Sequence, residues 1–278
     1  MRLRLRPPAK LNRFLHIVGR RADGYHLLQT AFELIDWCDE LTIETRSDDR
    51  VVLIGGTAGV PAERDLVCRA ARLLQTLRPE AGCTLHLNKH IPTGAGLGGG
   101  SSDAAAVLLG LNRLWNLRLD LPRLLELGLQ LGADVPVFLG QTPAYAEGVG
   151  ERLQALPWVD RPYLVVHPGV ELGTAAMFAA ADLCRAMPSL SLQDYLAGQP
   201  TRNVFEPVAR RLSPEVERCF DWVGRFGPAR LTGSGSAVYC ELTDPAAANV
   251  ALAALPERWR GRVVRTLTNW FDKVEAEG

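Results

Sequence analysis

The chain has 278 residues, of which 47% are hydrophobic and 22% charged, so it can bury a sizeable core beneath a soluble surface. Its 31 basic and 31 acidic residues give no net charge, whereas polynucleotide binders usually carry a basic excess. The six cysteines are scattered, and no two have the two-residue spacing of a zinc knuckle or redox pair. We therefore expect free thiols in a reducing cytoplasm and no nucleic-acid partner.

The sequence also argues against a membrane partner. Met1–Arg6 is basic but lacks the apolar segment of a signal peptide. The longest nearly uninterrupted apolar stretch, Ala104–Leu111, is too short to span a bilayer. We expect a cytoplasmic protein, and nothing in the sequence indicates its oligomeric state.

Alternation of apolar and polar residues predicts several strands in the first half of the chain. Arg2–Leu5 has the pattern of an exposed strand, and residues 41–43 and 51–54 predict further short strands. The strictest alternation runs from Cys83 to Ile91, where only Lys89 is out of pattern on the apolar side.

Helix signals follow the same order. Asp65 is a plausible N-cap for a helix through Leu77, and a second helix, capped by serine, is expected from Ser101 to Trp115. A third should run from Leu121 to Leu131 and end at Gly132, before a strand-like segment at residues 137–139.

A boundary between two lobes is expected near Pro157, so that residues 1–157 form the first lobe and residues 158–278 the second. The second lobe should contain, in order, a strand at residues 163–167, a helix at 174–184, a glycine turn into a strand at 230–242, a helix at 246–255 and a strand at 262–267. Strands and helices mix without regular βαβ alternation, which predicts an α+β fold.

The sharpest local signal is a glycine loop, with five glycines in the seven residues from Gly94 to Gly100. Without Cβ atoms the backbone can curl around phosphate and point its N–H groups inward. The helix that follows adds its own free N–H groups, and Ser101 and Ser102 could add hydroxyl donors. A flexible linker is the alternative, but linkers rarely lie between a strict strand and a capped helix.

Two other kinds of phosphate-binding loop are alternatives to this one. A Walker A loop needs a lysine after its last glycine, and Gly100 is followed by serine. The spacing of Gly94, Gly96 and Gly99 does match the dinucleotide fingerprint, which makes an NAD-dependent dehydrogenase the rival hypothesis. That fold needs a buried strand after the helix, whereas residues 116–122 lead into another helix.

Three motifs in order carry a resemblance. Pro92–Ala106 resembles the central motif of GHMP kinases, a superfamily that includes galactokinase, homoserine kinase and mevalonate kinase; Pro8–Asn12 and Leu231–Ala237 resemble its first and third motifs. The resemblance implies an α+β protein with an N-terminal lobe like ribosomal protein S5 domain 2 and a ferredoxin-like C-terminal lobe. ATP and a small-molecule acceptor would meet in the cleft between them.

Finer motifs narrow the resemblance. Arg21–His26, Leu131–Pro136, Ala146–Gly150 and His167–Gly169 are similar to the members that act on 4-diphosphocytidyl-2-C-methyl-D-erythritol, and the match extends from about Pro8 to about Thr268. It implies transfer of the ATP γ-phosphate to the 2-hydroxyl of the methylerythritol unit, in the non-mevalonate route to isoprenoids. Another GHMP kinase, or a sugar sensor of the same fold that binds without turnover, are the alternatives.

By this resemblance Asp134 is the expected general base, and Lys10 should lie beside it and polarise the acceptor hydroxyl. Taken alone, Asp134 would be assigned as a capping residue and Lys10 as a surface charge. Asn12 offers both a donor and an acceptor, which suits a polyol or phosphate oxygens.

The acceptor's nucleotide half should lie between Tyr25 and Phe178, with His26 bonded to the cytosine edge and Thr174 touching the methylerythritol end. From periodicity alone, Phe178 would be a core residue and Thr174 a helix N-cap.

The residues expected on the ATP side share one segment, the end of the strand and the glycine loop. They are Lys89, Pro92, Thr93, Gly94, Ala95, Gly96, Leu97, Gly98, Gly99, Gly100, Ser101 and Ser102. Related kinases usually carry Asn where Asp65 stands, which puts an adenine contact there in doubt. Mg²⁺ is an expected cofactor because it neutralises charge on the transferred phosphate, with its ligands open among Ser102, Asp103 and Asp134.

Overall fold

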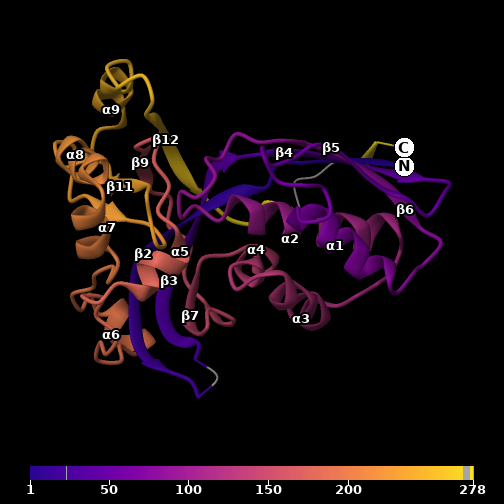
Figure 1. Cartoon of the computed structure of the whole chain (residues 1–278), viewed down its shortest axis with the longest axis horizontal. Coiled ribbons are helices and arrows are strands. Elements are labelled where there is room, and N and C mark those ends of the chain that lie inside the picture. Colours follow the sequence, from indigo (N-terminus) through magenta and orange to yellow (C-terminus); the bar gives the residue numbers. More distant parts are fainter. Residues whose placement is uncertain (23, 272–275, 278) are drawn as a thin grey trace.

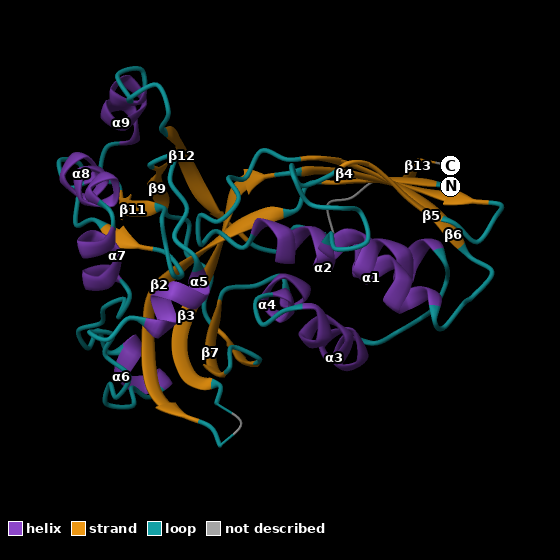
Figure 2. Cartoon of the chain, viewed as in Figure 1, coloured by secondary structure: helices purple, strands orange, loops and turns teal. Residues whose placement is uncertain are grey.

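The computed structural model describes residues 1–22, 24–271 and 276–277, and two sheets organise it (Figures 1 and 2). The first is five-stranded, in the order β13-β1-β4-β6-β5. Its strands are β1 (Arg2–Leu5), β4 (Glu40–Arg46), β5 (Val51–Gly55), β6 (Gly82–Asn88) and β13 (Ala276–Glu277). One face of it is covered by α1 (Leu66–Gln75) and α2 (Gly99–Leu114), and α3 (Leu121–Leu131) and α4 (Val135–Gly140) pack against these two helices on the side away from the sheet.

Alternation in β6 explains how this layer is built. Cys83, Leu85 and Leu87 are buried against the helices, while Asn88 is exposed. The helix α2 is buried along most of its length and lies at the centre of the core. Its position fixes the glycine loop, which leads directly into it.

The second sheet has eight strands, in the order β10-β11-β9-β12-β3-β7-β8, with β2 paired to β3. The strands β2 (Pro8–Arg20) and β3 (His26–Cys38) form a long antiparallel pair that bends through the middle of the molecule (Figure 2). In their register Lys10 lies opposite Leu34, and Asn12 lies opposite Phe32. The pair therefore carries the first motif into the centre of the protein.

The remaining elements follow in sequence order. The strands are β7 (Ala144–Gly148), β8 (Arg152–Ala155), β9 (Pro162–His167), β10 (Arg230–Leu231), β11 (Val238–Glu241) and β12 (Arg260–Leu267). The helices are α5 (Thr174–Ala179), α6 (Leu192–Leu196), α7 (Glu206–Leu212), α8 (Pro214–Val223) and α9 (Pro245–Leu252). After β12 the chain returns to the first sheet, where Trp270 is buried and its indole N–H donates to the Phe138 carbonyl at 3.1 Å.

The α+β fold class is confirmed, and so are the strands in the first half and the helix that ends at Gly132. The first strand is not exposed as expected, since Leu3 and Leu5 are buried, and the strand expected to reach Ile91 ends at Asn88. Residues 137–139, expected as a strand, are helical in α4, because a short apolar run does not distinguish the two structures. The first helix ends at Gln75, so Leu77 is 46% exposed. The boundary expected between residues 157 and 158 falls between β8 and β9 and stays a prediction.

Two helix ends differ from the expectation. The second helix begins at Gly99 with Gly98 as its N-cap, so the last two glycines of the loop lie in its first turn and no serine caps it. The helix expected over residues 174–184 ends at Ala179. There Arg185 donates to the carbonyls of Phe178 at 2.6 Å and Ala180 at 2.8 Å, which satisfies the helix end.

Candidate active site

Two adjoining hollows flank the glycine loop. The larger, a cleft of about 1140 Å³, lies over β2 and β3, and the smaller, about 350 Å³, lies beside the start of α1. Both are lined by Gly94, Gly96, Gly98 and Ser101. The loop is thus a wall shared by the two hollows.

All but one of the predicted site residues line one of these two hollows. All the expected catalytic and acceptor-binding residues line the larger cleft: Lys10, Asn12, Tyr25, His26, Asp134, Thr174 and Phe178. Lys89 and residues 92–101 line the smaller hollow. Ser102 is the exception, because its side chain is completely buried and lines neither.

The geometry of the loop requires glycine at its centre. Gly96 and Gly98 have φ angles of 75° and 73°, in the left-handed region that other residues rarely adopt. A Cβ atom on Gly96 would lie 2.2 Å from the Thr232 carbonyl oxygen, and one on Gly98 would lie 3.1 Å from Lys10 Cγ. The loop therefore packs directly against both other motifs.

The third motif is tied to the loop and to β2 by hydrogen bonds. The Ala237 N–H donates to the Ala95 carbonyl at 3.0 Å, and the Gly233 N–H donates to Asn12 Oδ1 at 2.9 Å. The Thr232 hydroxyl donates to the Gly96 carbonyl at 3.3 Å. Segments more than 200 residues apart in sequence thus form one unit, with Asn12 and Gly233 as an example.

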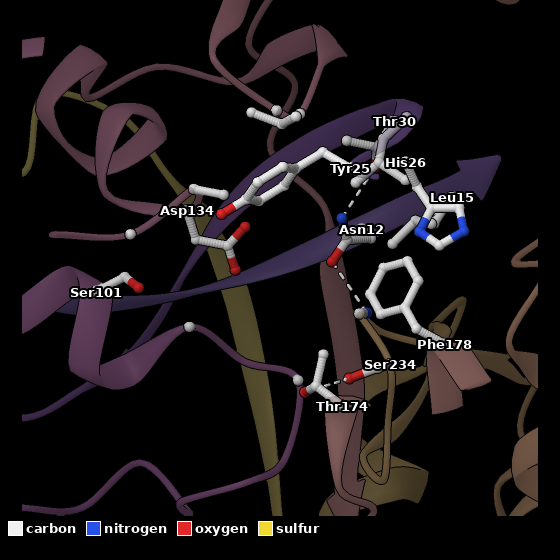
Figure 3. Close-up of a pocket in the computed structure, with 18 of the residues that line it drawn as sticks. Asn12, Leu15, Tyr25, His26, Thr30, Ser101, Asp134, Thr174, Phe178 and Ser234 are labelled. Atoms are coloured by element: carbon white, nitrogen blue, oxygen red, sulfur yellow. Dashed lines mark hydrogen bonds between the residues drawn. The ribbon is translucent and has the colours of Figure 1, made fainter. Parts of the chain in front are cut away.

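Lys10 and Asp134 form an ion pair in the larger cleft, with Lys10 Nζ 3.4 Å from Asp134 Oδ2. The Lys10 side chain is 3% exposed and the Asp134 side chain 37%. Asp134 occupies the N-cap position of α4, yet its side chain makes no capping bond. Its carboxylate therefore faces the cleft and not the helix, so a capping role does not explain it (Figure 3).

Asn12 holds this pair in place. Its amide oxygen accepts from Lys10 Nζ at 2.5 Å and from the Gly233 N–H, while its NH₂ group donates to the Thr30 hydroxyl at 2.9 Å. Both ends of the amide are thus engaged within the protein. In this arrangement Asn12 orients Lys10 and the third motif, and its expected contact with the acceptor stays a prediction.

The aromatic residues are arranged differently from the expected sandwich. His26 stacks on Phe178, with ring centroids 4.9 Å apart and an interplanar angle of 22°. Tyr25 is 66% exposed. Its hydroxyl points toward Asp134, so that Asn12 lies between this hydroxyl and the stacked rings of His26 and Phe178 (Figure 3). The rings of Phe178 and Phe205 pack nearly perpendicular to each other, as the periodicity indicates for a core residue, and Phe178 also lines the cleft.

His26 is held neutral at physiological pH. Burial lowers its pKa below the ordinary 6.5, and the guanidinium groups of Arg20 and Arg185 lower it further. Its Nε2 atom is buried and has no hydrogen-bond partner. A neutral imidazole has one donor and one acceptor nitrogen, which suits the edge of a base.

Thr174 links the acceptor side to the third motif. Its hydroxyl and that of Ser234 lie 3.0 Å apart (Figure 3). The N-cap of α5 is Gly173, so Thr174 lies in the first turn of the helix and not at its cap. Its hydroxyl therefore borders the cleft next to the loop that carries Ser234.

The out-of-pattern Lys89 is explained by two buried carboxylates. Its ammonium donates to Asp103 at 2.6 Å and also to Asp39, whose side chain is completely buried. Burial alone would lower the pKa of Lys89, but these carboxylates outweigh it and raise the pKa. Lys89 is therefore a charged wall of the smaller hollow and not a residue extending toward solvent at the end of a strand.

Asp65 caps α1, as the sequence predicts. Its Oδ1 accepts from the Val67 N–H and its Oδ2 from the Thr57 N–H, both at 3.1 Å. Because both oxygens are used, Asp65 shapes the edge of the smaller hollow through the backbone.

Sequence reasoning missed Asp39, Thr30 and Arg185. Asp39 and Thr30 act through distant partners, Lys89 and Asn12, which lie 50 and 18 residues away. Arg185 instead bonds the carbonyls of Phe178 and Ala180, a few residues before it in the chain. No local pattern indicates the contacts of Asp39 and Thr30, because they form only in the folded chain; the bond between Thr30 and Asn12, for example, depends on the pairing of β2 with β3.

The donor set fits a magnesium ion that arrives with the nucleotide. In the described part of the chain, no group of three or more His, Cys, Asp or Glu side chains could hold a metal ion. Ser102 Oγ and Asp103 Oδ1 have no hydrogen-bond partner, but both atoms are buried. Of the three candidate ligands, this leaves the partly exposed carboxylate of Asp134. Phosphate oxygens and water would therefore supply most of the ligands of the magnesium ion.

Asp103 predicts a pH dependence of stability. Burial raises its pKa from 3.8 to about 8, although Lys89 opposes the shift. The folded chain therefore holds this proton more tightly than the unfolded chain between about pH 4 and pH 8, so stability falls as the pH rises through that window. Asp103→Asn should remove this slope in urea unfolding at pH 5, 6.5 and 8. Parallel pH profiles for the two proteins would contradict the assignment.

Comparison with known proteins identifies the family of the chain. Residues 65–141 match the family model "GHMP kinases N terminal domain", and residues 179–261 match "GHMP kinases C terminal". The chain is 51% identical over 261 residues to the 4-diphosphocytidyl-2-C-methyl-D-erythritol kinase of Thiobacillus denitrificans, covering 94% of each protein. The chain belongs to this kinase family. A relative with the same name, from Nitrosococcus oceani, is 48% identical to this chain, and the match covers 93% of this chain and 92% of the relative.

Solved structures agree with the family. A crystal structure of 4-(cytidine 5'-diphospho)-2C-methyl-D-erythritol kinase superposes with a TM-score of 0.81 at 35% identity, covering 96% of this chain and all of that one. A mevalonate kinase structure, at 15% identity and a TM-score of 0.68, shows that the two share a fold. No helix in the described residues of this kinase is long and apolar enough to cross a membrane.

Proposed function

We propose that this chain transfers the γ-phosphate of ATP to the 2-hydroxyl of 4-diphosphocytidyl-2-C-methyl-D-erythritol, in the non-mevalonate route to isoprenoids. The observation that carries the proposal is the Lys10–Asp134 pair, which lies in the larger cleft beside the loop that separates it from the smaller hollow. The family names support the choice of acceptor.

Asp134 would act as the general base. Its partly exposed carboxylate accepts the proton of the 2-hydroxyl as the oxygen attacks the γ-phosphorus, the bond to the β-phosphate oxygen breaks, and ADP leaves. The buried ammonium of Lys10, 3.4 Å from that carboxylate, stabilises the negative charge that develops on the attacking oxygen. Asn12 fixes Lys10 in this position through its amide oxygen.

The phosphates would bind in the glycine loop, where backbone N–H groups and the N-terminus of α2 offer donors. Mg²⁺ bound to the phosphates, with Asp134 as a candidate ligand, would neutralise part of their charge. The adenosine end would lie in the smaller hollow, beside Lys89 and the capped start of α1.

The cytidine end would lie beside His26, Phe178 and Tyr25. Neutral His26 can bond the cytosine edge once the base replaces its contact with Phe178, and Tyr25 can close over the base from its exposed position. Thr174 would contact the methylerythritol end. All of these residues line one cleft, which is large enough for a nucleotide-linked polyol.

The proposal extends to the setting of the reaction. All six cysteines are free and five of them are buried, which fits a reducing cytoplasm. The acceptor is a small molecule, and we propose no nucleic-acid or membrane partner.

The test is ADP formation from Mg-ATP with a panel of acceptors. We expect ADP release that depends on 4-diphosphocytidyl-2-C-methyl-D-erythritol and is near background with mevalonate, homoserine or no acceptor. Turnover with mevalonate instead would overturn the acceptor and keep the superfamily. ATP binding without turnover on any acceptor would favour a sensor that binds only.

Phe178→Ala should weaken acceptor binding. Loss of one aromatic face from a base costs about 1–3 kcal/mol in nucleic-acid complexes, which corresponds to a rise of roughly 5- to 150-fold in KM for the acceptor. The KM for ATP should stay within about twofold, since Phe178 does not line the smaller hollow.

Phe226→Ala is the matched control, because Phe226 packs against the same C-terminal core but lies outside the cleft. It should lower stability without changing the KM for the acceptor. An unchanged KM in Phe178→Ala would remove Phe178 from the site.

A further inference from the structure

One buried carboxylate lies behind the smaller hollow without lining it. Asp39 follows the last residue of β3, Cys38, and its side chain is completely buried. Its Oδ1 accepts from the His90 N–H at 2.5 Å and from the Ile91 N–H at 2.8 Å, while its Oδ2 accepts from Lys89 Nζ. Asp39 thus binds three consecutive residues at once.

These three residues connect β6 to the glycine loop. The strand ends at Asn88, and the loop begins at Pro92. The N–H groups of His90 and Ile91 lie beyond the ladder of β6 and are satisfied by Asp39 instead. Because hydrogen bonds to a charged acceptor are strong, Asp39 sets the direction in which the chain enters the loop.

Asp39 also orients the ammonium that borders the hollow. Asp39 and Asp103 accept hydrogen bonds from two of the three N–H donors of the Lys89 ammonium. The ammonium lies close to the start of α2, because a Cβ on Gly99 would be 3.2 Å from Lys89 Nζ. The third donor is left for a ligand in the hollow that Lys89 lines.

The two carboxylates differ in what they connect. Asp103 lies on α2 and would move with the glycine loop, whereas Asp39 lies between β3 and β4, which are consecutive in sequence but belong to different sheets. Asp39 therefore links the sheets to both Lys89 and the loop entrance, which border the same hollow. The backbone N–H of Asp39 also donates to the Pro7 carbonyl at 3.0 Å. This bond extends the link to the residue before the first motif.

We propose that Asp39 is a positioning residue for the nucleotide: it acts through Lys89 and the backbone of residues 90–91 to preform the pocket for the nucleoside part of ATP. The inference rests on the proposed function only for the identity of the nucleotide. Asp39 touches neither substrate, so its effect should appear in ATP binding and not in the chemical step.

Asp39→Asn separates this role from simple packing. An asparagine oxygen can still accept from His90 and Ile91, but its NH₂ group then faces the Lys89 ammonium, donor against donor. We expect the dissociation constant for a non-hydrolysable ATP analogue, measured by calorimetry without acceptor, to rise about tenfold or more. In turnover, KM for ATP should rise similarly, while kcat and KM for the acceptor stay within about twofold.

A double-mutant cycle with Lys89→Met tests whether Asp39 acts through the lysine. Lys89→Met alone should weaken analogue binding to a similar extent, and adding Asp39→Asn should weaken it by less than the single changes combined. Circular dichroism confirms that each variant is folded, and if Asp39→Asn does not fold, Lys89→Met carries the test.

Two results would overturn the inference: unchanged analogue binding in either folded variant, or two fully additive effects. Because binding is measured without an acceptor, neither result depends on which acceptor the kinase uses. Conversely, failure of the acceptor assay would leave the ATP-binding measurement intact.

Discussion

Asp134→Asn should lower kcat by about 10²–10⁴-fold, the usual contribution of a general base, with little change in the KM of either substrate. The amide has nearly the same shape as the carboxylate but cannot accept the proton of the attacking hydroxyl. The fold should be unaffected, since the Asp134 side chain makes no capping bond and is 37% exposed. Steady-state ADP release at saturating ATP and acceptor measures the effect.

Asp120→Asn is the matched control for this change. Asp120 also stands at a helix N-cap, but its carboxylate accepts from the Arg123 N–H at 3.0 Å and it lies outside both hollows. Asparagine caps helices about as well as aspartate, so activity and stability should both be retained. A folded Asp134→Asn protein with more than half the normal kcat would exclude Asp134 as the base.

Gly96→Ala should abolish most ATP-dependent activity. A residue with a Cβ at φ 75° costs roughly 1–2 kcal/mol, and the new methyl group would lie 2.2 Å from the Thr232 carbonyl oxygen. Relief requires the glycine loop and the third motif to separate, which removes the arrangement that holds the phosphates. We expect kcat/KM for ATP to fall by about 100-fold or more, a loss of near 3 kcal/mol in transition-state stabilisation.

Gly198→Ala isolates the backbone contribution. Its φ of 82° is similar, but a Cβ there would meet no atom within 4 Å. This variant should lose about 1–2 kcal/mol of stability at most and keep its kinetic constants. Normal ATP kinetics in Gly96→Ala would show that the contact with Thr232 is not required for phosphate binding.

The local parts of the site could be predicted from the sequence because their physical causes are local. Glycines with left-handed backbone angles, a capping aspartate such as Asp65 and the alternation of β6 depend on neighbouring residues. The resemblance then supplied the order of the motifs and placed Lys10 and Asp134 in one cleft, where the structure has them 3.4 Å apart.

The rest depends on contacts between distant segments. The long pair β2 and β3 was missed because its buried polar residues, such as Asn12 and Thr30, break the apolar alternation that identifies strands. Those residues are tolerated because they bond each other, a fact that only the register reveals. The stacking of His26 on Phe178 has the same origin, since their segments meet only in the folded chain.

The central claim is that phosphate reaches the 2-hydroxyl of the acceptor, and ³¹P NMR of the product tests it most directly. The carbon that bears this hydroxyl also bears the methyl group and has no hydrogen, so a phosphate there lacks three-bond coupling to a proton. We predict a new phosphomonoester singlet, formed together with ADP, while the diphosphate bridge of the acceptor stays intact. A split phosphomonoester signal, or inorganic phosphate with unchanged acceptor, would contradict the account.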